Sequence, residues 1–117
     1  MKPVAPGTVI FHRHRGYGVI TSVNLLTGWV AARFGDEVRT LDLYGEAFEA
    51  RLSEPEWRTN SDVPDNRKPV EALVRDLEWA EALVFVFPTW WSGLPAILKG
   101  WLDRVFLPGV EIGRAHV

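Results

Sequence analysis

Two adjacent tryptophans, Trp90 and Trp91, are the residues of this chain best suited to hold a planar ligand. They belong to a loop made of Pro88, Thr89, Trp90, Trp91 and Ser92. An indole offers flat apolar area, and the backbone amides of Trp90 to Ser92 can donate hydrogen bonds to the polar edge of a ring. The alternative is that both indoles pack against a neighbouring helix or a subunit interface.

A strand and a helix must position this loop. Residues 82–87 form an apolar run rich in valine and phenylalanine, which is typical of a strand buried on both faces of a parallel sheet. We expect it to be the most buried element. After Pro95, apolar residues recur at helical spacing through residue 106 and predict a helix with one wide apolar face. In open α/β sheets, ligands bind beyond the carboxyl ends of the strands, where this loop would lie.

The segment 87–106, FPTWWSGLPAILKGWLDRVF, closely resembles the signature of the flavodoxin-like NAD(P)H:quinone oxidoreductases. The resemblance covers about residues 38–110 and includes Asp42-Leu43-Tyr44. It implies a truncated part of a doubly wound parallel α/β fold. It also implies reduction of a quinone-like acceptor by NAD(P)H, and a homodimer in complete relatives. The implied cofactor is FAD or FMN, held by Pro88, Thr89, Trp90, Trp91 and Ser92. The sequence shows no acid–base pair, so no catalytic residue is assigned.

Residues 5–44 are β-rich. Glycines divide them into strand-length pieces at 8–11, 19–23, 29–34 and 38–43, with Gly35-Asp36 as a hairpin turn between the last two. This predicts a small antiparallel meander or barrel. One set of residues resembles the SH3-like barrel of CarD-type and transcription-repair-coupling proteins, which bind RNA polymerase: Pro6, Gly7, His12, Gly16, Gly18 and Ile20. The function implied is a protein-interaction module that docks through a strand edge.

A competing interpretation makes residues 9–12 the first strand of the flavodoxin-like fold and places a helix at about residues 19–33. Arg13 stands where that family has proline, and Gly16-Tyr17-Gly18 replaces its phosphate-binding Ser-Phe-Asn. Residues 19–34 are also rich in valine, threonine and glycine, which disfavour a helix. The barrel interpretation is therefore preferred.

The remaining segments have local signals of their own. Ser53 and Glu56 form a capping-box pattern that predicts a short helix, and residues 60–67 are polar and turn-rich. A second helix is predicted from Pro69 to about Trp79. Residues 111–117 resemble a translated sequencing adapter. We therefore divide the chain into a β-rich segment (1–44), a partial flavin-binding domain (45–110) and a non-native tail (111–117). A join between unrelated genes near residues 38–43 is our hypothesis for this organisation.

Composition limits the possible functions. The chain has 117 residues, 47% of them hydrophobic, which fits one modest folded domain. A net charge of −2 gives no basic field for nucleic acid or a membrane, and the absence of cysteine excludes disulfides and thiol catalysis. His12 and His14 have no third partner, so no metal site is predicted. No export signal is seen at the start, and a cytoplasmic location is expected.

Overall fold

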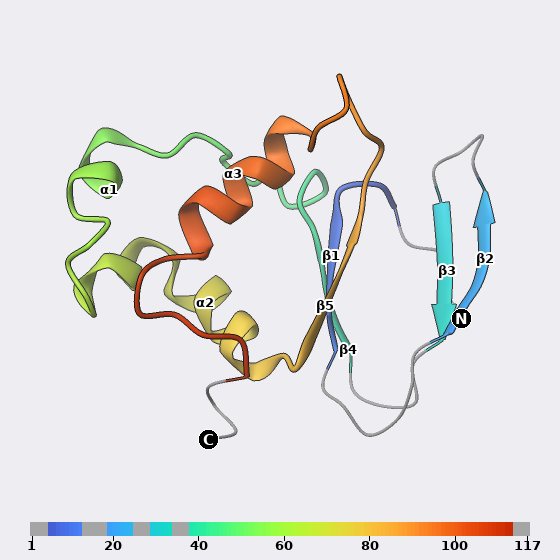
Figure 1. The fold of residues 1–117 in the computed structure, drawn as a ribbon, viewed down its shortest axis with the longest axis horizontal. Helices are drawn as coiled ribbons and strands as arrows, with labels where there is room; N and C mark the ends of the chain where they lie inside the picture. The colour runs from blue at the N-terminus through green and yellow to red at the C-terminus, as the bar shows by residue number, and fades with distance from the viewer. Residues whose placement is uncertain (1–4, 13–18, 25–28, 34–37, 114–117) are drawn as a thin grey trace.

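A computed structural model describes residues 5–12, 19–24, 29–33 and 38–113 of the chain. A three-stranded sheet has the helices on one side and a two-stranded hairpin on the other (Figure 1). The sheet consists of β1 (Thr8–His12), β4 (Val38–Asp42) and β5 (Ala82–Val86), and the hairpin of β2 (Val19–Asn24) and β3 (Trp29–Arg33). The helices are α1 (Glu54–Arg58), the 3₁₀ helix η1 (Asp65–Val70), α2 (Glu71–Trp79) and α3 (Ala96–Val105).

The sheet has the strand order β4-β1-β5, and β1 is antiparallel to both neighbours. β4 and β5 therefore run in the same direction, with β1 between them. The chain leaves β1 at His12 and begins β4 at Val38, and these two residues are register partners. Because this connection starts and ends at one end of the sheet, β4 has to return antiparallel to β1. The helices α1, η1 and α2 then carry the chain back, so that β5 can start at the same end as β4.

Helices packed on one side of a sheet agree with the expected α/β class, but the expectation for the strand at residues 82–87 is wrong in two respects. β5 pairs antiparallel with β1, and it is not the most buried element: Ala82 is exposed and only Val86 is buried. β1 is more buried, since Val9, Ile10 and Phe11 are at most 1% exposed. The physical reason is that β5 lies at an edge of the sheet, whereas β1 has a neighbour on each side.

The four strands expected in residues 5–44 are present within a residue or two of their predicted bounds. The predicted pairing of the last two is wrong, because β3 pairs with β2 while β4 pairs with β1. The turn at residues 35–36 lies outside the described residues. Strands at 19–24 and 29–33 also exclude the helix that the competing interpretation required. The barrel resemblance, the division at residue 44 and the foreign tail stay predictions.

Trp101 joins the helical layer to the sheet. Its side chain is fully buried, and its ring lies edge-on to Phe11 at 6.1 Å, to Phe85 at 5.8 Å and to Phe106 at 5.7 Å between centroids. The preceding Gly100 lets α3 approach the backbone of Ala50, because a Cβ at Gly100 would lie 2.5 Å from the Ala50 Cα. The apolar spacing predicted for α3 is confirmed, since the side chains buried on it face this core.

A polar clamp, formed by Ser53, Glu56 and Arg104, holds α1 against α3. The predicted capping box is present: Glu56 N–H donates to Ser53 Oγ, and Ser53 N–H donates to the Glu56 carboxylate. Arg104 Nε donates to the same carboxylate at 3.0 Å, and each of these two charged side chains is 15% exposed. Burial opposes the charge on Glu56, but the hydrogen bonds from Ser53 and Arg104 outweigh it and lower the pKa of this carboxyl.

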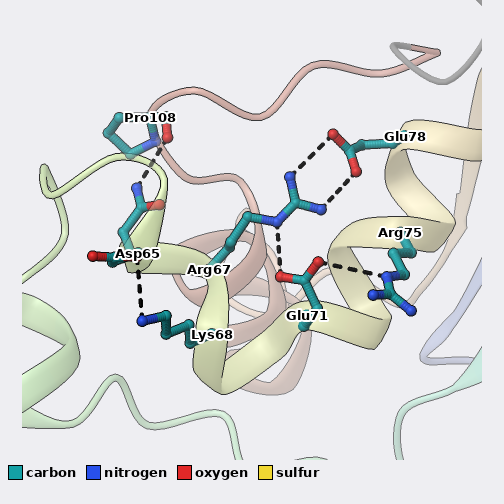
Figure 2. Close-up of polar contacts among 8 residues, drawn as sticks. Asp65, Arg67, Lys68, Glu71, Arg75, Glu78 and Pro108 are labelled. Carbon is teal, nitrogen blue, oxygen red and sulfur yellow. Dashed lines mark hydrogen bonds and ion pairs between the residues drawn. The ribbon is translucent and has the colours of Figure 1, made fainter.

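A second ion-pair network, centred on Arg67, ties η1 to α2 (Figure 2). Arg67 Nε donates to Glu71 at 2.8 Å, and its two terminal nitrogens donate to Glu78 at 2.6 and 3.1 Å. The bond to Glu78 is the main cause of a raised pKa of the Arg67 guanidinium. The neighbouring Asn66 side chain donates to the carbonyls of Asn60 and Pro108. The polar segment expected to be a loop is thus partly helical, and Asn66 links it to the segment that follows α3.

We expect Gly100→Ala to destabilise the fold. The new methyl group would overlap the backbone at Ala50, which cannot move aside as a flexible side chain would. The expected loss in the free energy of unfolding is about 1–3 kcal/mol, the usual cost of overpacking. Urea denaturation measures it. Gly93→Ala is the control, because a Cβ there meets only the Trp90 carbonyl oxygen at 3.6 Å. Equal stability of the two variants would contradict close packing at Gly100.

Glu56→Gln should weaken the clamp and change how stability depends on pH. Because the folded-state pKa of Glu56 is lowered, its contribution is fully present above the pKa of the unfolded chain and is lost as pH falls through the folded-state pKa. At neutral pH the variant should lose about 1 kcal/mol, the difference between a charged and a neutral hydrogen bond. At acid pH it should approach wild type. The difference between the two proteins is followed by urea denaturation over a pH series.

Glu54→Gln is the matched control for this variant. Glu54 pairs with Arg58 on the surface of α1, with both side chains more than two-thirds exposed, and such pairs contribute little. A pH-independent difference between Glu56→Gln and wild type would show that the Glu56 charge contributes nothing through this clamp.

Candidate functional site

The loop that follows β5 lies where β4 and β5 both end, and it leads into α3 (Figure 1). The start of β1 is fastened to the same edge: Gly7 N–H donates to the Val86 carbonyl at 2.7 Å, and Leu43 N–H donates to the Gly7 carbonyl at 3.1 Å. This is the edge at which α/β sheets bind ligands. The loop therefore has the position that the sequence analysis expected.

Residues 90–93 form a tight reverse turn. Trp90 N–H donates to the Gly93 carbonyl at 3.1 Å, and Gly93 N–H donates to the Trp90 carbonyl at 3.0 Å. The two central residues have left-handed backbones, with φ of 53° at Trp91 and 63° at Ser92. Positive φ at both central positions is the requirement of a type I′ turn, which usually selects asparagine and glycine.

A tryptophan in this conformation stores strain. Side chains rarely adopt positive φ, and each such residue costs on the order of 1–3 kcal/mol. Such strain persists only where the surroundings hold it, and it concentrates at ligand-binding and catalytic sites. Here the two hydrogen bonds between Trp90 and Gly93 close the turn around Trp91. The backbone geometry thus adds a second reason, besides residue type, to regard the turn as a functional site.

All five residues predicted to bind a cofactor are exposed: Pro88, Thr89, Trp90, Trp91 and Ser92. Trp90 is 61% exposed and Trp91 is fully exposed. Packing of the Trp91 indole against a neighbouring helix, one of the two alternatives raised from the sequence, does not occur in the described part of the chain. The indole instead presents both of its faces to the surroundings. Packing at a subunit interface, the other alternative, stays a prediction.

The turn leaves fewer amides for a ligand than the sequence suggested. The amide of Trp90 is committed to Gly93. Within the described residues, no backbone acceptor is found for the amides of Trp91 and Ser92. Two adjacent N–H groups can donate hydrogen bonds to the acceptors along one edge of a flat ring, while the exposed indole packs beside that ring.

Tyr44 is a neighbour that the sequence analysis assigned no role. It follows β4 at the same edge of the sheet, is 58% exposed, and covers Gly7, where an added Cβ would lie 2.5 Å from its ring. Gly7 has a φ of 86°, a conformation suited to glycine. The only signal for Tyr44 in the sequence was the Asp42-Leu43-Tyr44 segment, which indicated the family but did not predict where the Tyr44 ring lies.

No group of three histidine, aspartate or glutamate side chains is placed to hold a metal ion among the described residues. None of the helices described is sufficiently long and apolar to span a bilayer.

Comparison with known proteins gives one family match. The model of a family with the description "flavodoxin-like fold" matches residues 21–116. The match includes β3 and most of β2, and the comparisons give no support to the alternative polymerase-binding module.

Curated proteins and a solved structure are similar over part of the chain. An "Uncharacterized NAD(P)H oxidoreductase YcaK" of Escherichia coli is 39% identical over 83 residues, which cover 68% of this chain and 41% of that protein. "NAD(P)H dehydrogenase [quinone] 1" of Cavia porcellus is 43% identical over 93 residues, covering 66% and 34%. The crystal structure of Smu.1420 from Streptococcus mutans is 40% identical, with a TM-score of 0.46 over 60% of this chain and 37% of that one. The chain thus spans about two fifths or less of these relatives.

Trp91 is fully exposed and Trp101 is fully buried, so replacing each of them by alanine tests the site directly. Trp91→Ala should change the free energy of unfolding by less than about 0.5 kcal/mol, because an exposed indole loses no packing. Trp101→Ala should cost about 3–5 kcal/mol, the usual loss for a large aromatic residue in a core. Both are measured by urea denaturation of the whole chain. A large loss in Trp91→Ala would identify its indole as core packing and remove it from the site.

Proposed function

The chain belongs to the family with the flavodoxin-like fold, and we propose that it carries part of the flavin site of an NAD(P)H oxidoreductase that reduces quinone-like acceptors. The observation that carries the proposal is the strained turn of residues 90–93, which holds an exposed indole and two unengaged amides at the ligand-binding edge of the sheet. The printed names of the relatives, an NAD(P)H oxidoreductase and an NAD(P)H dehydrogenase [quinone], agree with this class of reaction.

The residues of the turn fit a flavin. The isoalloxazine ring is planar, largely apolar on its faces and rich in acceptors along one edge. Trp91 would supply apolar area beside the ring, and the amides of Trp91 and Ser92 would donate to its polar edge. Pro88 and Thr89 would line the approach from β5. A bound flavin supplies the hydride chemistry between NAD(P)H and the acceptor, while the protein supplies binding, orientation and exclusion of water.

The identity of the flavin and the assembly follow from family resemblance in this proposal. FAD and FMN share the ring that the turn would hold, so both are candidates, and complete relatives are expected to be homodimers. The catalytic residues are not assigned, because no described acid or base lies in the turn itself.

We expect the 117-residue chain to bind FMN and FAD with dissociation constants weaker than about 1 µM. One loop contributes few contacts, and each hydrogen bond adds only about 0.5–1.5 kcal/mol net. Trp91→Ala should weaken binding by roughly 5- to 150-fold, which corresponds to about 1–3 kcal/mol for a large apolar side chain. Trp90→Ala should weaken it less. Quenching of flavin fluorescence during titration measures all three proteins.

Trp57→Ala is the matched control. Trp57 lies on α1 and is 66% exposed, so the variant removes an exposed indole away from the turn. It should bind flavin as wild type does. Equal affinity of Trp91→Ala and wild type, with both folded, would overturn the site. Sub-micromolar binding by wild type would contradict the expectation that a single loop is insufficient.

A further inference from the structure

We propose that the turn of residues 90–93 has two forms of opposite hand, and that a flavin binds the left-handed form of this structure in preference to a right-handed form. The inference rests on the proposed function, because it concerns the same turn. In the left-handed form, Trp91 and Ser92 have φ of 53° and 63°. In a right-handed type I turn both residues would have negative φ, the ordinary conformation of residues that carry a side chain.

One hydrogen bond that closes the turn is available to both forms. Gly93 N–H donates to the Trp90 carbonyl at 3.0 Å. This bond between the fourth and first residues is common to type I and type I′ turns, so it does not determine the hand. The hand depends instead on the strain of positive φ and on the twist of the chain on either side of the turn.

The twist of the flanking chain contributes little to this turn. Left-handed turns are favoured between long paired strands, because their twist matches that of the strands. Here Trp90 and Gly93 form an isolated bridge, with no ladder beyond it in the part of the chain that the structure describes. One pair offsets little of the strain of two left-handed residues, neither of which is glycine or asparagine. The two forms are therefore close in free energy.

The two forms present different groups to a ligand. Type I and type I′ backbones are mirror images, so the peptide group between Trp91 and Ser92 and the Trp91 indole lie on different sides of the turn in the two forms. A ring held at this edge of the sheet can therefore meet the Ser92 amide and the indole together in only one of them. A ligand that binds one form shifts the population toward it, and its apparent affinity falls with the fraction of chains in the other form. The hand of the turn thus sets the flavin affinity.

Substitutions at Ser92 change the preferred hand while they keep the Trp91 indole and both amides. Glycine adopts positive φ without strain, asparagine tolerates it, and the β-branched valine disfavours it. Ser92→Gly and Ser92→Asn should therefore tighten FMN binding by up to about 5-fold, and Ser92→Val should weaken it by a similar factor. Glycine has no side chain and asparagine has a polar one, so a gain shared by both variants comes from the backbone. Titration of FMN fluorescence measures the dissociation constants.

The same three substitutions at Thr89 are the matched control. Thr89 is exposed in the same loop, and its φ is not positive. Replacing it by glycine, asparagine and valine should not give the order of FMN affinities expected at Ser92. The same order at both positions would show that the substitutions act through side-chain size or loop flexibility, and would overturn the inference.

Nuclear magnetic resonance of the flavin-free chain tests the two forms independently of the proposed function. A short distance between Hα and the amide hydrogen of one residue marks positive φ, so the nuclear Overhauser effect within residue 92 should be stronger in Ser92→Asn and weaker in Ser92→Val than in wild type. The backbone chemical shifts of Trp91 in these three proteins should lie on one line, as they do for an averaged mixture of two forms.

The two measurements separate failure of this inference from failure of the proposed function. Trp91 shifts and a residue 92 signal that do not respond to Ser92→Asn and Ser92→Val would show a single form and overturn the inference, whether or not FMN binds. A turn that responds while the FMN affinities stay equal would overturn the preference of the flavin for the left-handed form. A turn that responds in a chain to which FMN does not bind at all would overturn the proposed function, and with it the role of the flavin in selecting the form.

Discussion

The pairing of β1 with both β4 and β5 is the interaction on which the rest of the described structure depends. It places Val9 between Leu41 and Phe85 on one face of the sheet, and this apolar row is the surface that the helices cover. Trp101 from α3 packs against this surface through Phe11 and Phe85. Gly100 allows the same helix to contact the backbone at Ala50. Without β1, β4 and β5 would have no common neighbour, and α3 would have no continuous sheet to cover.

The direction of β1 explains how a β-rich N-terminal segment is accommodated in a flavodoxin-like sheet. In that fold the first strand lies between the second and third, and β1 occupies the corresponding place between β4 and β5. A parallel first strand needs a crossover to reach the next strand. Here the connection between β1 and β4 contains the β2–β3 hairpin and returns to the end it left. β1 therefore fills the central position in the opposite direction, while β4 and β5 keep the parallel relation that their helical crossover provides.

The position of the turn at residues 90–93 is a consequence of the same layout. β5 ends beside Gly7 and Leu43, so the loop that follows it emerges at the ligand-binding edge. The chain thus presents an aromatic turn suited to a planar ring at this edge of the sheet.

The sequence by itself determined the local features, because their causes lie within a few residues of one another. The capping box of Ser53 and Glu56, the apolar face of α3, the positions of the strands and the aromatic loop were all predictable from neighbouring residue types. The family resemblance was also readable from a contiguous segment, and the family match agrees with it.

Only the tertiary structure decided how the elements combine. The apolar run of β5 is equally compatible with burial on two faces and with an edge position, since the difference depends on distant strands. The direction of β1 depends on which end of the sheet its connection to β4 reaches, and residue types do not specify this. Trp91 and Trp101 are chemically the same, yet one is fully exposed and the other fully buried. The left-handed backbone at Trp91 could not be predicted, because neither central residue of the turn is glycine or asparagine. The hydrogen bonds between Trp90 and Gly93 hold the turn in this conformation.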